Sequence, residues 1–177
     1  MEEIGKYDNN SRVKLIMKKL SLSEQLELAE KIATDAHKNQ YRYKHNIPLD
    51  KYIVHPRRIV KSLGEKYAND PNCIIYQIVA WLHDVLEDTE WTREDLISAG
   101  IGEEIVVMVE ALSRQEGETY YNFIMCMDHS HMARKIKIAD IEDNMNDDLQ
   151  EGSLKDKYRL SLYILNEFEK KWKKFKK

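Results

Sequence analysis

The sequence predicts an all-α fold, and three observations support that prediction. Apolar residues recur at intervals of three, four and seven, the spacing that places them on one face of a helix. No alternating run of apolar and polar residues is long enough to predict a sheet. With 42% hydrophobic and 33% charged residues, and only 6 Gly and 3 Pro among 177, the composition excludes a disordered or fibrous chain. We therefore expect one globular helical domain.

The first third of the chain predicts two helices with a loop between them. The helix expected over 23–40 begins at Ser23, a residue type that caps helix N-termini. Residues 41–52 lose the helical period and are expected to form a loop. A second helix is expected over 56–68, where Pro56 occupies the first turn, a position at which proline is tolerated.

The strongest helical signal lies between Ile75 and Leu86, where six apolar residues form one continuous stripe. We expect a single uninterrupted helix there. A shorter helix is expected between Thr92, which caps its start, and Gly100, which ends it. Another helix is expected over 105–112.

The last third of the chain predicts three more helices. One begins in the segment 117–127, and the next, over 132–149, follows a turn near 129–130. The final helix, over 153–177, is amphipathic and ends in KKWKKFKK, which holds six of the 28 basic residues. We expect these lysines to cover the solvent side of the helix, with contact to RNA or another anionic surface as the alternative.

Composition and charge exclude several classes of protein. The apolar runs are far shorter than the ~18 residues of a membrane span, and the N-terminal residues contain no apolar signal region, so we expect a cytoplasmic protein. A net charge of −3 excludes a uniformly basic nucleic-acid binder. Cys73 and Cys126 are far apart and outside any CxxC motif, which predicts neither a disulfide framework nor a thiolate zinc site.

Two histidines and two carboxylates on separate predicted helices have the donor types of a metal site. His55 stands at the start of one helix, His83 and Asp84 are adjacent in the apolar central helix, and Asp140 lies among apolar neighbours. Charged groups on a buried helix are costly unless they are paired or bind a metal. Together the four residues would supply nitrogen and oxygen ligands to a divalent first-row metal and leave positions for water.

The pattern H…HD…D resembles the HD superfamily of metal-dependent phosphohydrolases. Four segments narrow the resemblance to the hydrolase domain of RelA/SpoT-type alarmone enzymes: AHKNQYR, YIVHP, WLHDVLEDT and IKIADIEDN. The resemblance covers about residues 25–150 and stops before any synthetase domain. It implies a helical HD-domain bundle, with residues 1–177 as a single domain and the metal site between central helices.

The resemblance also implies a role for individual residues. By position, the metal ligands are His55, His83, Asp84 and Asp140, and the catalytic acidic pair is Glu87 and Asp88. The resemblance implies that Arg42 stacks on the base and that Asn144 contacts the ribose. Basic groups are needed to neutralise the leaving phosphates, and the candidates that the sequence offers are Lys137, Arg42, Lys44 and Arg114. Manganese is the usual ion of the family, with iron, zinc, cobalt, nickel and magnesium left open.

The implied activity is removal of the 3′-pyrophosphate of guanosine tetra- and pentaphosphate. Tyr43 and Ile141 stand where the family has basic residues, which leaves other small-molecule substrates open: an adenosine alarmone or the 2′-phosphate of NADPH. A pyrophosphorylated RNA end is a further alternative. So is a catalytically silent module that senses a nucleotide or neutralises a toxin partner, although the intact ligand set argues against silence. The sequence leaves the oligomeric state open.

Overall fold

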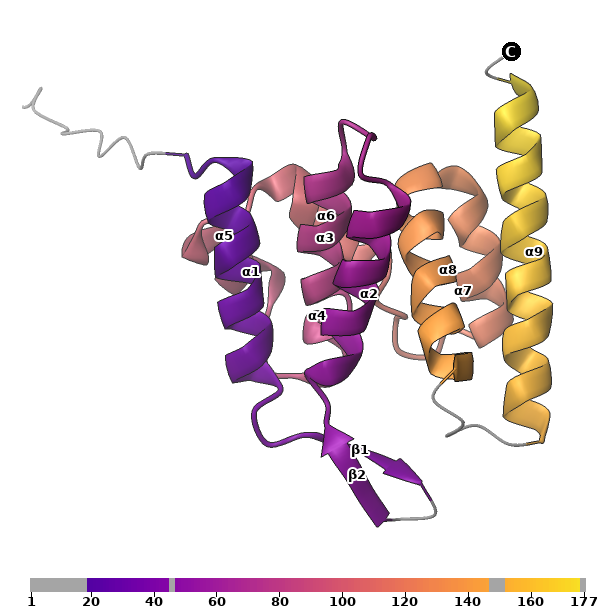
Figure 1. The fold of residues 1–177 in the computed structure, drawn as a ribbon, viewed down its shortest axis with the longest axis horizontal. Helices are drawn as coiled ribbons and strands as arrows, with labels where there is room; N and C mark the ends of the chain where they lie inside the picture. Colours follow the sequence, from indigo (N-terminus) through magenta and orange to yellow (C-terminus); the bar gives the residue numbers. More distant parts are fainter. Residues whose placement is uncertain (1–18, 45–46, 147–151, 176–177) are drawn as a thin grey trace, which may run out of the picture.

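The computed structural model describes residues 19–44, 47–146 and 152–175, and these residues are mainly helical, as the sequence predicts (Figure 1). In chain order the elements are α1 (Leu22–Ala36), β1 (Tyr41–Lys44), β2 (Ile47–Lys51), α2 (Val54–Lys66), α3 (Cys73–Leu82), α4 (Val85–Asp88), α5 (Arg93–Ala99), α6 (Glu103–Glu110), α7 (Tyr120–Cys126), the 3-10 helix η1 (Met127–His129), α8 (His131–Asn146) and α9 (Ser153–Phe175).

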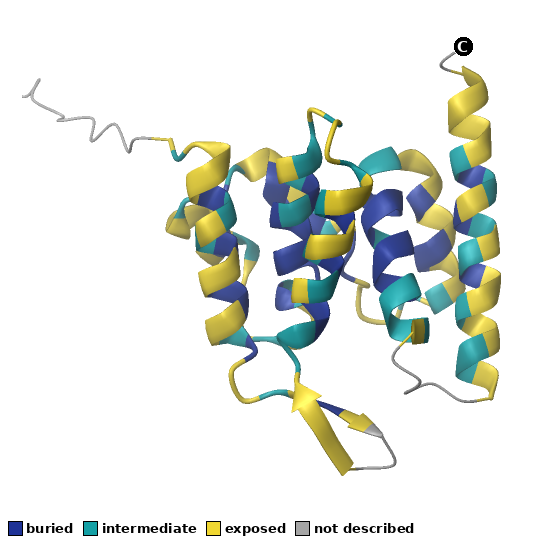
Figure 2. Ribbon diagram, in the orientation of Figure 1, coloured by how far each residue is buried: buried dark blue, intermediate teal, exposed yellow. Residues whose placement is uncertain are grey.

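Helix α3 is the centre of the bundle. It packs against α1, α2, α6 and α8, and α8 in turn packs against α2 and α9. The last five residues of α3, from Ile78 to Leu82, are all buried because every side of this helix meets a neighbour. Figure 2 shows the buried residues gathered on the inner helices, while α1 and α9 bury one face each. The residues that the sequence predicts as metal ligands therefore lie on, or directly after, the helices at the centre of the bundle.

Helix α1 begins slightly earlier than predicted. The cap is Ser21, not Ser23: the Ser21 side chain accepts a hydrogen bond from the backbone of Glu24, and the Glu24 carboxylate accepts one from the Ser21 amide at 2.7 Å. This reciprocal pair satisfies two backbone amides that a lone serine cap would leave without helical partners. A glutamate three residues after the serine therefore decides where the helix starts.

Residues 41–51 form an antiparallel hairpin where the sequence predicts a loop. Tyr41 pairs with Lys51 and Lys44 with Ile47, with an irregularity between Arg42 and Tyr43. Strand β2 is exposed at every position, so no buried face imposes an alternating pattern that the sequence could reveal. The hairpin projects from the lower end of the bundle in Figure 1, below α1 and α2.

The prediction of one uninterrupted helix between Ile75 and Leu86 is wrong. Helix α3 ends at Leu82, and α4 starts at Val85 after a turn. His83 Nδ1 donates to the Ala80 carbonyl oxygen at 2.8 Å, the acceptor that a continuous helix pairs with the amide of residue 84. The apolar stripe continues through the turn because Val85 is also buried, so the hydrophobic pattern does not register the break.

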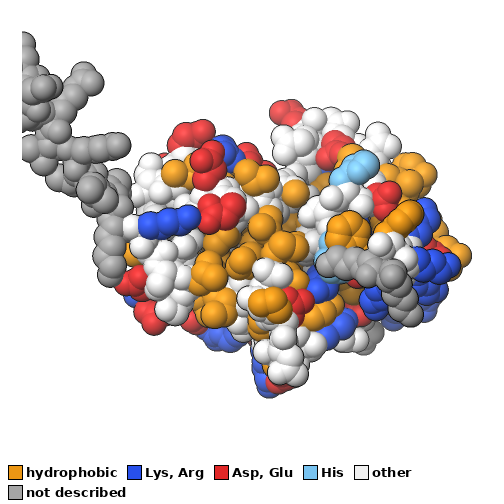
Figure 3. Space-filling model, turned by 90° about the horizontal axis from the view of Figure 1, so that it is seen from above, with side chains coloured by type: hydrophobic (Ala, Val, Ile, Leu, Met, Phe, Trp, Pro, Cys, Tyr) orange, Lys and Arg blue, Asp and Glu red, His pale blue; other side chains and the backbone are white. Residues whose placement is uncertain are grey.

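The remaining predicted helices lie close to their expected bounds, and the turn near 129–130 is present as η1 followed by extended Ser130. Residues 147–149 of the predicted 132–149 helix lie outside the described residues. Along α9, Leu165 and Phe168 are buried, but Phe175 is 87% exposed because the helix runs past the core. Figure 3 shows basic side chains gathered along the edge of the molecule where α9 ends. None of the described helices has the length and apolar character that a membrane span requires.

Candidate metal centre

A cleft of about 320 Å³ lies at the hairpin end of the bundle. Its walls come from the hairpin, the start of α2, the turn after α3, α4, the start of α7, the middle and C-terminal part of α8 and the start of α9. Its lining residues are Tyr41, Arg42, Tyr43, Tyr52, His55, Asp84, Glu87, Asp88, Tyr120, Lys137, Asp140, Asn144 and Tyr158. The cleft therefore brings together most of the residues that the sequence singles out.

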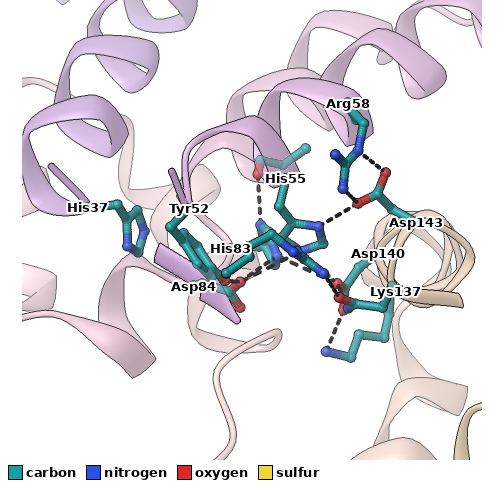
Figure 4. Close-up of polar contacts among 12 residues, drawn as sticks. His37, Tyr52, His55, Arg58, His83, Asp84, Lys137, Asp140 and Asp143 are labelled. Atoms are coloured by element: carbon teal, nitrogen blue, oxygen red, sulfur yellow. Dashed lines mark hydrogen bonds and ion pairs between the residues drawn. The ribbon is translucent and has the colours of Figure 1, made fainter. Parts of the chain in front are cut away.

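The four predicted ligands converge at the base of this cleft (Figure 4). His55 Nε2 lies 3.1 Å from Asp140 Oδ1 and 4.0 Å from Asp84 Oδ2. His83 Nε2 lies 2.8 Å from Asp84 Oδ2 and 3.8 Å from Asp140 Oδ1. Within the described part of the chain, His55, His83 and Asp84 form the one group of three or more metal-capable side chains. Asp140 lies beside this group, because its Oδ1 faces the Nε2 atoms of both histidines.

The orientation of both histidine rings fits a divalent cation. Each ring uses Nδ1 for a contact away from the cluster: His83 with the Ala80 carbonyl at 2.8 Å, and His55 with Asp143 Oδ2 at 2.7 Å. Each Nε2 is thus left to face the carboxylates, the arrangement that metal-binding histidines adopt. The buried His83 Nε2 has no hydrogen-bond partner although Asp84 Oδ2 is 2.8 Å away, because the two atoms are not aligned for one. Because His83 Nε2 and Asp84 Oδ2 lie close together without a hydrogen bond between them, both atoms could bind the same cation.

Both carboxylates are held in place by further side chains. The Tyr52 hydroxyl donates a short hydrogen bond to Asp84 Oδ2. Asp140 Oδ1 accepts from Asn144 Nδ2 at 2.7 Å, and Asp140 Oδ2 lies 2.8 Å from Lys137 Nζ. Lys137, Asp140 and Asn144 share one face of α8, as their spacing predicts. The carboxylates are therefore oriented before any ligand binds.

The electrostatics of the cluster favour charged groups despite burial. Burial lowers the pKa of His83, but the negative charges of Asp84 and Asp140 outweigh it and raise that pKa to about 9. Burial raises the pKa of Asp140, but Lys137 and the two histidines bring it well below its ordinary value. The pKa of Asp84 is lowered in the same way, chiefly by His83. Positive charge is thus stabilised at the point where the donors meet, and a cation would replace the histidine protons there.

The acidic pair lies one turn beyond Asp84, on α4. Glu87 accepts a hydrogen bond from the backbone amide of Arg114 at 3.1 Å, and its other oxygen is 3.8 Å from Arg114 Nε. Burial, and then the charges of Asp84 and Glu87, raise the pKa of Asp88 to about 6. A carboxyl group with this pKa exchanges protons readily near neutral pH.

The predicted substrate residues have different surroundings. Arg42 is mostly buried and donates to Asn144 Oδ1 at 2.8 Å, which joins the hairpin to α8. Lys137 lines the cleft with its ammonium group bound to Asp140. Arg114 contacts Glu87 but does not line the cleft; it lines a separate small pocket on the other side of Glu87. The side chain of Lys44 lies outside the described residues, so the prediction for it stays untested.

Sequence reasoning missed three residues of the site: Tyr52, Arg58 and Asp143. Tyr52 and Arg58 stand three residues before and after His55, and Asp143 stands three residues after Asp140. In a helix this spacing places side chains on a common face, and it is the signal that could have identified Arg58 and Asp143, whereas Tyr52 lies in the turn before α2. His37 is also close, with its ring 4.6 Å from that of Tyr52, but its Nδ1 contacts Gln40 and burial lowers its pKa.

A larger cavity, of about 870 Å³, lies away from these residues. Tyr67, Asp70, Lys135 and Trp172 are among its lining residues. Asp70 and Lys135 are bound to each other at 3.0 Å, and among the described residues no cluster of three or more metal-capable side chains lies there. The chemistry of the donor set, not the size of the cavity, therefore identifies the candidate site.

Comparisons with known proteins relate the chain to enzymes of alarmone metabolism. It is 30% identical over 131 residues to the guanosine-3′,5′-bis(diphosphate) 3′-pyrophosphohydrolase of Aquifex aeolicus, which covers 70% of this chain and 18% of that protein. It is also 30% identical over 129 residues to a probable GTP pyrophosphokinase of Mycobacterium leprae, covering 68% of this chain and 15% of that protein. The chain thus spans less than a fifth of the length of these curated relatives. No protein-family model matches it.

The fold has a solved counterpart. The structure of a metazoan orthologue of SpoT, described as hydrolysing ppGpp and acting in starvation responses, superimposes with a TM-score of 0.65 at 19% identity. The match covers 81% of this chain and 84% of that one, and it confirms the helical HD-domain fold. The chain is thus similar in sequence to curated SpoT/RelA-type ppGpp 3′-pyrophosphohydrolases over about 70% of its length, and it shares its fold with the SpoT orthologue.

Proposed function

We propose that this chain is a metal-dependent hydrolase that removes the 3′-pyrophosphate of guanosine tetra- and pentaphosphate. The observation that carries the proposal is the convergence of four metal-capable side chains beside an acidic pair at the base of one cleft. The named activity of the Aquifex aeolicus relative supports the choice of reaction. A small phosphorylated nucleotide is the substrate class that this proposal implies.

His55, His83, Asp84 and Asp140 would hold one divalent ion, which we propose to be manganese. Two imidazoles and two carboxylates suit manganese, although they would also accept other first-row metals. When bound, such an ion lowers the pKa of a coordinated water and attracts a phosphate oxygen, which is the chemistry that phosphate hydrolysis requires.

Side chains around the ligands orient the carboxylates and move protons. Tyr52 holds one oxygen of Asp84, while Lys137 and Asn144 hold Asp140 from two sides. We assign Glu87 and Asp88 to orienting the attacking water and transferring its proton, because both line the cleft one turn beyond Asp84. Asp88, with a pKa of about 6, can hold or release a proton near neutral pH.

The nucleotide would enter from the hairpin side of the cleft. Arg42 and five tyrosines line the walls of the cleft. A planar guanidinium group or a phenol ring can stack on either purine. Stacking discriminates weakly between bases, so we expect the adenosine analogue to be cleaved as well, within about 10- to 100-fold of the guanosine nucleotide. We expect Arg42→Ala to weaken the binding of both.

The test is pyrophosphate release in the presence of manganese from a panel of nucleotides. The panel contains the guanosine and adenosine 3′-pyrophosphates, NADPH and a 5′-triphosphate. We expect turnover of both 3′-pyrophosphates, and its loss together with the bound metal in Asp84→Ala. Asp128→Asn, which changes an exposed carboxylate of η1, is the matched control. Cleavage confined to NADPH or to the 5′-triphosphate would contradict the proposed substrate and leave the metal site intact.

A further inference from the structure

His55 is oriented by a carboxylate from another helix. Its Nδ1 lies 2.7 Å from Asp143 Oδ2, while its Nε2 faces Asp140 and Asp84. His55 belongs to the first turn of α2, and Asp143 to the C-terminal half of α8. Both side chains are largely shielded from solvent, with 2% and 13% of their surface exposed. Figure 4 shows the carboxylate on the opposite side of the ring from the cluster.

Arg58 holds that carboxylate with both arms of its guanidinium group. Its Nε donates to Asp143 Oδ1 at 2.7 Å, and a terminal nitrogen donates to Oδ2 at 2.8 Å. This two-bond geometry fixes the plane of the carboxylate as well as its position. Arg58 lies on α2, one turn after His55. The side chains of His55, Arg58 and Asp143 therefore link α2 to α8 beside the candidate metal site.

We propose that Asp143, held by Arg58, is a positioning residue that fixes the ring orientation and the tautomer of His55 for metal binding. When His55 carries its proton on Nδ1, the N–H group donates a hydrogen bond to Asp143. The Nε2 lone pair then faces the point where Asp84 and Asp140 converge. The carboxylate also makes the ring a stronger electron donor. The inference rests on the metal site of the proposed function, but not on the identity of the nucleotide.

The two histidines of the site differ in how they are fixed. The His83 ring is held by the backbone carbonyl of Ala80, an acceptor that no side-chain substitution removes. The His55 ring depends on a side chain from a neighbouring helix. Metal affinity is therefore coupled, through Asp143, to the packing of α2 against α8. Arg58 balances the charge of Asp143, which would otherwise add a third carboxylate charge close to Asp84 and Asp140.

The chain offers a matched control one residue away. Glu142 also lies on α8 and also pairs with a base on α2, with its carboxylate 3.6 Å from Lys66 Nζ. Glu142→Gln and Asp143→Asn each replace one carboxylate by an amide and break one ion pair between the same two helices. Only Asp143 contacts His55. The comparison therefore separates the positioning of the ring from the loss of charge or of helix packing.

The experiment measures the dissociation constant of Mn²⁺ for the metal-free full chain by competition with a fluorescent chelator. We expect Asp143→Asn to weaken Mn²⁺ binding by about 10- to 100-fold, and Glu142→Gln to change it much less. Circular dichroism of both variants checks that the helices are retained. A loss smaller than tenfold in Asp143→Asn, or an equal loss in Glu142→Gln, would overturn the proposal.

Histidine ring nitrogen NMR gives a second readout that does not depend on turnover. In the wild type and in Glu142→Gln, His55 should carry its proton on Nδ1, in a hydrogen bond to a carboxylate. In Asp143→Ala that signal should shift or split between tautomers. An unchanged His55 signal in Asp143→Ala would contradict the inference. Failure of ppGpp hydrolysis with normal Mn²⁺ affinity in the wild type would instead count against the proposed substrate alone.

Discussion

Asp140 illustrates how single residues of the site are set by their neighbours. One carboxylate oxygen contacts Lys137, while the other accepts from Asn144 and faces the His55 ring. Burial raises the pKa of Asp140, but Lys137 and the two histidines together outweigh it and keep that pKa low. Its carboxylate is thus charged and fixed in position, which are the properties that a metal ligand needs.

Glu87 is a second single residue with a defined expected role: it should act on the attacking water and not on the metal. We expect Glu87→Gln to keep stoichiometric manganese and to lose roughly 100-fold or more in turnover, the usual contribution of a general acid or base. Because Glu87 also contacts Arg114, the control is Arg114→Gln, which removes the guanidinium and leaves the Glu87 carboxylate. Metal analysis and single-turnover rates measure both effects. Near-normal turnover in Glu87→Gln would remove this residue from the mechanism.

Asp88 is expected to reduce the stability of the metal-free protein above its folded pKa. The pKa of its carboxyl is about 6 in the fold and near 4 in an unfolded chain, so ionisation disfavours folding as pH rises through this interval. We expect Asp88→Asn to raise the free energy of unfolding at pH 8 by roughly 1 kcal/mol, after allowance for solvent screening, and to leave it unchanged below pH 4. Urea titrations in chelator at both pH values measure this. A destabilised variant at pH 8 would contradict the expectation.

At the scale of elements, the turn between α3 and α4 decides how the HD pair is presented. His83 and Asp84 leave the helical path, so that His83 uses its Nδ1 on the Ala80 carbonyl and turns Nε2 toward the cluster. Helix α4 then resumes for one turn and carries Glu87 and Asp88 to the cleft. An uninterrupted helix would also place these side chains on one arc. In such a helix, however, the Ala80 carbonyl would accept from the amide of residue 84 and would not hold the His83 ring.

The turn before α3 is tied to α8 by another, partly buried ion pair, away from the cleft. Asp70 binds the ammonium of Lys135 at 3.0 Å and the hydroxyl of Tyr76 at 3.0 Å, and it accepts from the Asn72 amide at 2.9 Å. The Asn72 amide first, and then Lys135 and Tyr76, lower the pKa of Asp70 to about 2, despite a smaller opposing effect of burial. These contacts join α3 to α8 near their other ends.

Because that pKa is lower in the fold than in the unfolded chain, Asp70 stabilises the protein above pH 4, and this contribution disappears as pH falls towards 2. We expect Asp70→Asn to lower the free energy of unfolding at pH 7 by about 1 to 2 kcal/mol, and by less at pH 3. Urea unfolding at the two pH values measures the difference, with the exposed Glu90→Gln as control. A loss of equal size at both pH values would show that charge is not the cause.

At the scale of the whole molecule, the site joins parts of the chain that are far apart in sequence. The proposed ligands come from α2, the turn after α3, and α8, while the hairpin reaches α8 through the contact between Arg42 and Asn144. Binding at such a site requires all three regions to be folded. Metal binding should therefore be coupled to global stability.

We expect manganese at 100 times its dissociation constant to raise the free energy of unfolding by about 2.7 kcal/mol relative to protein in chelator. The reason is that the ion binds the folded chain and not the dispersed ligands of the unfolded one. Thermal and urea unfolding with and without Mn²⁺ measure the change, and Asp84→Ala should show none. An equal rise in Asp84→Ala would mean that the stabilising ion binds elsewhere.

The sequence by itself determined the helical fold, and it identified the candidate donors of the proposed site. Periodicity is a local property, and it correctly predicted that Lys137, Asp140 and Asn144 share a side of α8. The identity of the donors was visible because few residue types combine buried positions with metal-binding atoms.

Only the tertiary structure decided the hairpin, the break after Leu82 and the contacts that orient the ligands. Exposed strands have no buried face to mark them, and the apolar stripe runs through the break unchanged. Asp143 meets His55 across 88 positions of sequence, a contact that depends on how α2 and α8 pack. Spacing along one helix reports which side chains share a face. It carries no information on which faces meet, because that is set by the packing of the whole core.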